Sequence, residues 1–172
     1  MDYSKDYDFL VMKGAKFQVM INAAINGLVP ALTMSGMIGI FTAGGMVQDF
    51  LIMNVFLIFF VFIFSRLEVI KWRQKNNAEP VAFDPVKHKG LEKAMHRHPM
   101  AEFFVIFVKY NLLMAAPAIA VCLFIFGDAG IPVHQFVFIK ATYSVFLANA
   151  VAMHGGKLGS IHIESEAKTA KA

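Results

Sequence analysis

The sequence predicts an all-α integral membrane protein with four transmembrane helices arranged as two consecutive hairpins. Of the 172 residues, 58% are hydrophobic and only 16% are charged, and the mean hydropathy is +0.58. Four apolar stretches are each long enough to cross a bilayer, which takes about 20 helical residues. Basic residues gather on one side of these stretches. A water-soluble domain of this length has too little interior to bury so much apolar surface.

The four stretches divide the chain into alternating membrane and polar segments. The predicted spans are Phe17–Phe41, Phe50–Ile70, Ala101–Phe126 and Pro132–Met153. The acidic start of the chain does not resemble a cleavable signal peptide, so the first span is expected to be retained. The predicted segments are a cytoplasmic N-terminal segment, a first hairpin, a cytoplasmic loop, a second hairpin and a cytoplasmic tail, at residues 1–16, 17–75, 76–100, 101–154 and 155–172.

The distribution of Lys and Arg predicts the orientation. Of the 16 basic residues, 14 lie in the N-terminal segment, in the stretch from Arg66 near the end of span two to the start of span three, or in the tail. The two short turns, 42–49 and 127–131, contain none. This asymmetry places both termini and the middle loop in the cytoplasm. The expected partner of the basic charge is then the anionic inner leaflet of the bilayer rather than nucleic acid.

The cytoplasmic loop is predicted to contain a short basic amphipathic helix on the membrane surface. Asp84 and Pro85 form a helix-start signal, with a capping side chain followed by proline at the first helical position. Pro99 is expected to end this helix, which has apolar residues towards one side and lysines around the rest. Gly155 and Gly156 are expected to stop the last span, with a polar tail after them.

Small residues predict which spans pack closely. Such residues let helix backbones approach each other in lipid. Those of span one recur at every fourth position: Ala23, Gly27, Ala31, Ser35 and Gly39. Spans three and four are also rich in alanine, so spans one, three and four are expected to form a tight core. The phenylalanine-rich span two is expected to face lipid or a partner protein. Pro30 and Pro117 lie mid-span and are expected to kink their helices.

Two lysines and several amides lie inside the predicted spans. Lys109 and Lys140 are each about 12 Å inside a span, at about 1.5 Å per residue. An intramembrane lysine is a candidate functional residue, although its long side chain can also reach the interface. Lys140 could pair with Asp128 or Asp49, and Lys109 with Glu102 or Glu68. The amides are Asn22, Asn26, Asn54, Asn111 and Asn149. These residues form either interhelical hydrogen bonds or, with the lysines, a polar path for an ion or small anion.

Several kinds of site are not indicated. The single cysteine, Cys122, excludes a disulfide framework and a dithiol redox pair. No glycine pattern suggests a nucleotide site. His88, Glu92 and His96 would share one face of the loop helix, a spacing that can hold a metal but equally gives exposed pairs. The sequence therefore predicts no catalytic residues, no cofactor and no metal site.

The function expected from these observations is that of a non-enzymatic subunit or accessory protein of a membrane assembly. Such a protein would pack its helices against other membrane subunits or against copies of itself. The alternative is a small oligomeric channel or transporter that uses Lys109 and Lys140 with the intramembrane asparagines. The expected location is the bacterial cytoplasmic membrane, because no organellar targeting sequence is visible.

Overall fold

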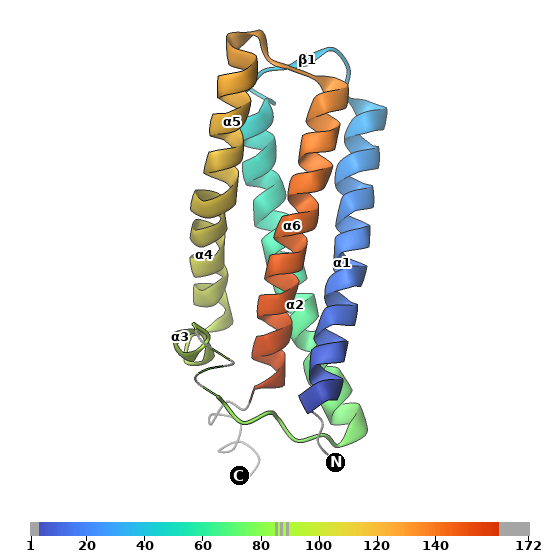
Figure 1. Ribbon diagram of the computed structural model, residues 1–172, viewed down its shortest axis with the longest axis vertical. Coiled ribbons are helices and arrows are strands. Elements are labelled where there is room, and N and C mark those ends of the chain that lie inside the picture. The colour runs from blue at the N-terminus through green and yellow to red at the C-terminus, as the bar shows by residue number, and fades with distance from the viewer. Residues whose placement is uncertain (1–3, 85, 87, 89, 162–172) are drawn as a thin grey trace.

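Long helices running side by side make up most of the protein (Figure 1). The computed structural model describes residues 4–84, 86, 88 and 90–161. Three long helices are continuous: α1 (Ser4–Thr33), α2 (Met46–Asn76) and α6 (Val133–Ser160). A fourth rod is built from three consecutive pieces: α4 (Pro99–Tyr110), the π-helical turn η1 (Asn111–Ala115) and α5 (Ala116–Phe126). We call this rod the α4–α5 rod.

Three of the helical segments within the described residues are long and apolar enough to cross a membrane. They are Met46–Asn76, Pro99–Ala129 and Val133–Ser160. The helix α1 is not among them, because it ends at Thr33, well before the predicted end of span one at Phe41. Its apolar part is therefore confined between Lys16 and Thr33. The length and composition of these three helices indicate a membrane protein. The less apolar helix α1 lies beside them.

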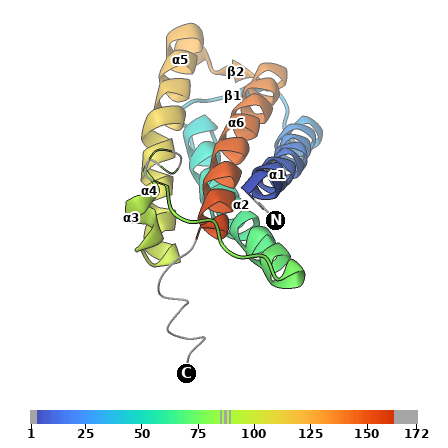
Figure 2. The same ribbon diagram turned by 60° about the horizontal axis from the view of Figure 1, so that its bottom comes forward.

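A small strand pair joins the two turns at the end of the bundle opposite the termini (Figures 1 and 2). Strands β1 (Met37–Ile38) and β2 (Ile131–Pro132) are antiparallel, with Met37 opposite Pro132. The 3₁₀ turn η2 (Gly127–Ala129) precedes β2. The sequence did not predict this contact. It fixes the start of α6 close to the end of α1, because the two strands belong to the turns that adjoin these helices.

The core lies around α6, which packs along both α1 and α2. In the apolar windows of α2 and α6, 44% of the residues are buried, whereas in the α4–α5 rod only 11% are. The prediction that spans one, three and four form the core is therefore wrong for span three, and span two is a core helix. Phenylalanine did not mark a lipid-facing helix here, since Phe50 and Phe62 are buried against neighbouring helices.

Glycines near the end of α6 allow its close contact with two helices. A Cβ atom at Gly155 would lie 2.6 Å from the carbonyl oxygen of Phe62, and one at Gly159 would lie 2.6 Å from that of Arg66. Gly156 faces the other way, towards the Val11 side chain of α1. The prediction that Gly155 and Gly156 stop the helix is wrong, because α6 continues to Ser160. These glycines are packing residues, as expected of small residues four apart in a membrane helix.

The small-residue stripe of span one is only partly at a helix contact. Ala23 is half-buried, and a Cβ atom at Gly27 would lie 3.5 Å from that of Ala141 on α6. Ala31 is exposed, and Ser35 and Gly39 lie beyond the end of α1. The predicted stripe reaches beyond the helix. It assumed that the helical spacing continues after Thr33, where the chain instead forms a turn and β1.

The middle loop contains much less helix than predicted. Its helix α3 covers only Glu92–Met95, and Pro85 lies outside the described residues. Pro99 does not end a helix but occupies the first position of α4, where its missing N–H costs nothing. The Nδ1 of His98 accepts a hydrogen bond from the backbone N–H of Met100 and caps this helix. A basic surface helix spanning the loop is therefore not present in the described part.

The π turn η1 explains how Pro117 is accommodated in the α4–α5 rod. Pro117 cannot donate to the carbonyl of Leu113, and its ring would collide with that carbonyl in a regular α-helix. The wider turn at Asn111–Ala115 comes directly before it. Such π turns are often found at functional positions. Here the turn contains Asn111, one of the predicted polar residues.

Candidate functional site

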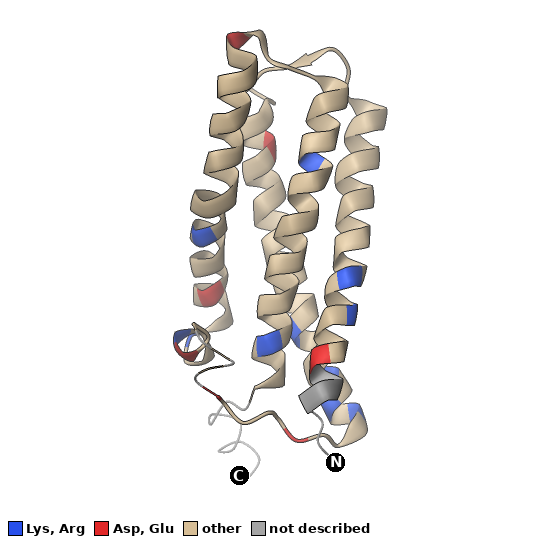
Figure 3. Ribbon diagram, viewed as in Figure 1, with Lys and Arg blue, Asp and Glu red and all other residues tan. Residues whose placement is uncertain are grey.

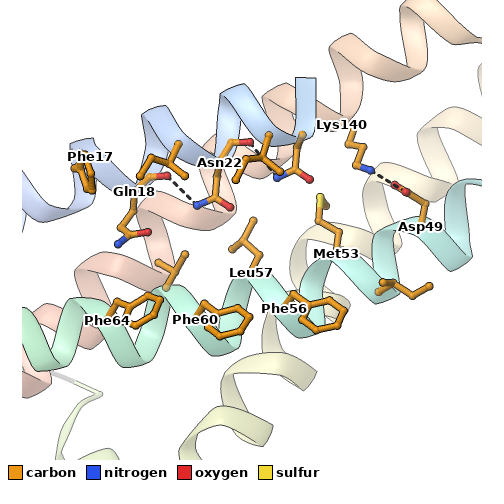
Figure 4. A pocket seen from close by; sticks show the side chains of 15 residues that line it. Phe17, Gln18, Asn22, Asp49, Met53, Phe56, Leu57, Phe60, Phe64 and Lys140 are labelled. Atoms are coloured by element: carbon orange, nitrogen blue, oxygen red, sulfur yellow. Dashed lines mark hydrogen bonds and ion pairs between the residues drawn. The ribbon is translucent and has the colours of Figure 1, made fainter. Parts of the chain in front are cut away.

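A groove of about 790 Å³ runs between α1 and α2 on the side of the bundle (Figure 4). We call it the α1/α2 groove. It exists because α6 contacts both helices closely while they contact each other little. The residues that line it are Phe17, Gln18, Ile21, Asn22, Ile25, Asn26, Asp49, Ile52, Met53, Phe56, Leu57, Phe60, Val61, Phe64 and Lys140.

The wall formed by α2 is apolar and aromatic. Phe56, Phe60 and Phe64 follow each other at every fourth position and stack, with ring centroids 6.4 Å and 5.8 Å apart. All three are exposed, because the groove is open towards the outside of the bundle. The buried side chains of Met53 and Leu57 continue this wall towards α6. This row of rings provides a smooth apolar strip parallel to the helix axis.

The wall formed by α1 carries amide groups between aliphatic side chains. The Nδ2 group of Asn22 donates to the carbonyl of Gln18 at 2.8 Å, and that of Asn26 donates to the carbonyl of Asn22 at 3.0 Å. Both amide N–H groups are thus partly satisfied by the helix itself. Within the described part of the chain, the side-chain carbonyl oxygens of Asn22 and Asn26 have no donor and remain as acceptors at the groove.

An ion pair lies at the end of the groove near the strand pair. Lys140 on α6 donates from Nζ to the Oδ1 of Asp49 on α2 at 2.7 Å (Figure 4). The Lys140 side chain is only 9% exposed. Of the two carboxylates considered for this lysine, Asp49 is therefore its partner. The other oxygen of Asp49, Oδ2, is buried and has no hydrogen-bond partner within the described part of the chain.

A second cluster of polar side chains lies in the core between α2, η1 and α6. The fully buried Asn54 donates to the Oδ1 of Asn111 at 3.0 Å and to the hydroxyl of Tyr143 at 2.8 Å. Asn111 also donates to the carbonyl of Phe107. Two of the predicted amides are therefore brought together from different helices. Tyr143 was not among the predicted residues, although a phenol in the middle of an apolar span needs a partner.

A third polar group fixes the start of α4 at the end of the bundle that carries the termini. Glu102 is 3% exposed and accepts from Arg97 at 2.9 Å. Its other oxygen lies 3.0 Å from the Nε2 of His154 on α6. Sequence reasoning did not place Glu102 and His154 together. The signal was the presence of a carboxylate in the first turn of an apolar span, where an unpaired charge is costly.

The remaining predicted residues lie apart from these groups. Lys109 is exposed on α4, and its Nζ lies 5.3 Å from the ring centroid of Tyr110, not against Glu102 or Glu68. Asn149 is exposed on α6. Lys140 and Asn26 belong to the α1/α2 groove, whereas Asn54 and Asn111 belong to the core. The structure thus distributes the predicted polar path over several separate places.

Among the described residues, no group of three or more His, Cys, Asp and Glu side chains is arranged to hold a metal ion. His88 instead accepts a hydrogen bond from the backbone N–H of Asp84 at 2.9 Å. The long apolar helices define a membrane protein of helical-bundle type. No protein-family model, curated protein or solved structure matches the chain.

Proposed function

We propose that this chain is a non-enzymatic subunit or accessory protein, with four membrane-spanning helices, that binds a second membrane-embedded helix along its α4–α5 rod. The partner helix belongs to another subunit or to a second copy of the chain. The observation that carries the proposal is the poor coverage of this rod, with 11% of its apolar window buried. A lipid-facing helix explains exposed apolar side chains, but it does not explain the polar and small residues on this rod.

The exposed surface of the rod has two features suited to a helix partner. Ala116 and Ala120 are exposed and lie one turn apart, which allows a second backbone to approach closely. Lys109, also exposed, holds a charge inside the apolar segment, where charged side chains usually find a partner or reach the interface. A neighbouring helix that packs closely against Ala116 and Ala120, and that places a carboxylate or carbonyl near Lys109, would match both features.

The proposed topology places both termini and the middle loop in the cytoplasm. Most Lys and Arg positions along the ribbon lie towards the end of the bundle where the termini and the loop are, and few lie towards the strand pair (Figure 3). This distribution agrees with the tendency of Lys and Arg to stay on the cytoplasmic side. In this topology α1 crosses the membrane beside α6, which packs along it.

The alternative function, an oligomeric channel or transporter, has less support. A path needs its polar groups to follow one another along one surface. Lys109 lies exposed on α4, whereas Lys140 is buried and paired with Asp49. In the core, Asn54 already donates to Asn111, and Asn111 donates to the carbonyl of Phe107. A location in the bacterial cytoplasmic membrane remains part of the proposal.

Extraction in native lipid followed by mass measurement and identification of the components tests the partner. A defined complex is expected for the unaltered protein. Ala120→Phe would hold a partner helix away from the rod, because it removes the close backbone approach that a small residue allows. It is expected to lower the assembled fraction about tenfold, which corresponds to about 1.4 kcal/mol. Ala24→Phe, at an exposed position on α1, is the matched control. Equal assembly of both variants, or a monomer in every case, would refute the proposed interface.

Labelling of introduced cysteines tests the topology. In a Cys122→Ser background, Ala43→Cys in the outer turn is expected to react with a membrane-impermeant thiol reagent added to intact cells. Gln74→Cys, at the end of α2, is expected to react only after the cells are opened. Both positions are exposed in the structure. The reverse pattern of labelling would overturn the proposed orientation.

A further inference from the structure

We infer that the α1/α2 groove is a binding site for a single-chain amphiphile with a neutral, hydroxyl-bearing head group, of which a monoacylglycerol is the simplest example. The head group would lie at the Asp49–Lys140 end, and the chain would follow the stacked phenylalanines of α2. This site is separate from the exposed face of the α4–α5 rod. It therefore does not depend on whether a partner helix binds there.

The dimensions of the groove favour one apolar chain over a helix. Its volume of about 790 Å³ lies within the range of small-molecule sites. From Asp49 to Phe64 the groove extends about 22 Å along α2, at about 1.5 Å per residue. A helix is about 10–12 Å across with its side chains, so a segment of that length occupies on the order of 2,000 Å³. Such a segment could cover the groove from outside but could not enter it.

The polar end of the groove matches a head group that both donates and accepts hydrogen bonds. A lysine ammonium has three N–H donors, and among the described residues Lys140 uses one of them, towards Asp49. The Oδ2 of Asp49 has no donor among the residues that the structure describes. Asn26 contributes an acceptor at the same level, because its neighbour Gly27 packs against Ala141, which follows Lys140. One hydroxyl can accept from Lys140, and two hydroxyls can donate to Asn26 and, once the Asp49 side chain turns towards the groove, to its buried Oδ2.

The charge of the site favours a neutral head group. Lys140 and Asp49 neutralise each other at 2.7 Å. An anionic carboxylate would be attracted by Lys140 but repelled by Asp49, and a cationic amine would meet the opposite combination. In a site of low polarity an unpaired charge is costly, whereas hydroxyl groups can complete the hydrogen bonds of the pair without adding a charge.

The surroundings of the groove also distinguish it from ordinary lipid contact. Lipid chains cover any apolar helix surface without a specific position. Here, Asn22, Asn26, Asp49 and Lys140 all line one open groove in a segment expected to lie within the bilayer. Polar groups in this position need partners that hydrocarbon chains do not provide. A bound head group at one end supplies those partners and fixes the position of the chain.

Photolabelling of the full-length protein in phosphatidylcholine nanodiscs tests the site. The probe is a monoacylglycerol with a diazirine in its acyl chain, and the labelled residues are identified by mass spectrometry. Labelling is expected to concentrate on α2 between Phe56 and Phe64. Ile25→Trp fills the groove from a position that is 55% exposed, and it is expected to lower labelling at least about tenfold. Leu28→Trp is the matched control, because Leu28 is 62% exposed on the same helix but does not line the groove.

Competition by unlabelled amphiphiles tests the head group. Monoacylglycerol is expected to displace the probe, whereas a fatty acid and an alkylamine of equal chain length are expected to displace it at least about tenfold less effectively. The double variant Asp49→Leu with Lys140→Met removes both charges together and is expected to abolish this preference. Retention of the preference in that variant would overturn the assigned head-group site.

Three results would overturn the groove proposal. They are equal labelling of the Ile25→Trp and Leu28→Trp variants, labelling spread evenly over the α4–α5 rod, and equal displacement by all three amphiphiles. A partner helix that crosslinks inside the groove and excludes the probe would also overturn it. Each variant is first checked for a monodisperse elution profile and an unchanged unfolding temperature, so that misfolding is not mistaken for loss of the site.

Discussion

The seam between α6 and α2 differs sharply from the contact that holds the α4–α5 rod. At the seam, Gly155 and Gly159 bring two backbones together, and buried aliphatic and aromatic side chains fill the space around them. The rod is held mainly at one edge, by the Glu102 group, the Asn54 network and a few aromatic contacts such as Phe59 with Phe103. The apolar window of the rod has a mean hydropathy of 2.1, which lies between the values of 2.4 for α2 and 1.6 for α6. The difference teaches that apolar character in a membrane helix does not determine whether the helix is buried.

The physical reason is the solvent. In water, burial of apolar surface drives helices together, and the buried face is the apolar one. In lipid, the surrounding chains are as apolar as the side chains, so close packing and polar contacts decide which helices associate. The seam therefore depends on small residues, and the rod depends on a few polar contacts. Four predictions test this comparison.

The largest effect is expected where the two backbones meet. Gly155→Ala would place a methyl group 2.6 Å from the carbonyl oxygen of Phe62, which belongs to a helix and cannot move alone. We expect a loss of about 3 kcal/mol in the free energy of unfolding, at the upper end of overpacking costs. Gly156→Ala, which meets the movable side chain of Val11, should cost about 1 kcal/mol. Denaturation in detergent micelles, followed by circular dichroism, would measure both, and equal costs would contradict the seam.

Loss of the buried carboxylate should loosen the rod. Glu102→Gln keeps the size of the side chain but removes the charge that faces Arg97 and His154. We expect a loss of about 2 kcal/mol, as for hydrogen bonds to charged groups. Increased hydrogen exchange should be confined to α4 and the end of α6. Arg97→Gln, which leaves His154 in place, should have a smaller effect, and a uniform increase in exchange would contradict the proposed clamp.

The amide network in the core should contribute less. Asn54→Leu removes three hydrogen bonds, one shared with Asn111 and two with the Tyr143 hydroxyl, and leaves both residues without their common partner. We expect a loss of about 1–2 kcal/mol, in line with interhelical hydrogen bonds in membranes. Asn149→Leu is the control, because Asn149 is exposed. Equal unfolding temperatures for the two variants would show that the network does not stabilise the bundle.

The smallest effect on stability is expected on the open face of the rod. The Phe124 side chain is 92% exposed, so Phe124→Ala should change the free energy of unfolding by less than about 0.5 kcal/mol. The same variant measured in the assembled complex distinguishes lipid from protein at this face. A lower assembled fraction with unchanged stability of the isolated chain would place Phe124 at the partner interface. A marked loss of stability in the isolated chain would contradict the exposed position of the rod.

The sequence predicted four membrane spans. Three of them correspond to helices that are long and apolar enough to cross a membrane. The length and hydropathy of a segment are local properties, and a bilayer requires about 20 apolar residues irrespective of the neighbouring helices. The sequence also narrowed the partners of Lys140 to two carboxylates, of which the structure selects Asp49. The ends of helices were less well predicted. Pro99 begins α4, whereas it was expected to end the loop helix, and α6 continues through Gly155 and Gly156.

Only the tertiary structure decided which helix is central, where the groove lies and which polar groups meet. Phenylalanines buried in the core and phenylalanines that line the groove occur on the same helix, as Phe62 and Phe60 show. A sequence pattern cannot separate them, because lipid and protein interior are equally favourable to an apolar side chain. The separation of α1 from α2 by their common neighbour α6 is a property of the whole bundle. The α1/α2 groove follows from that arrangement rather than from any one segment.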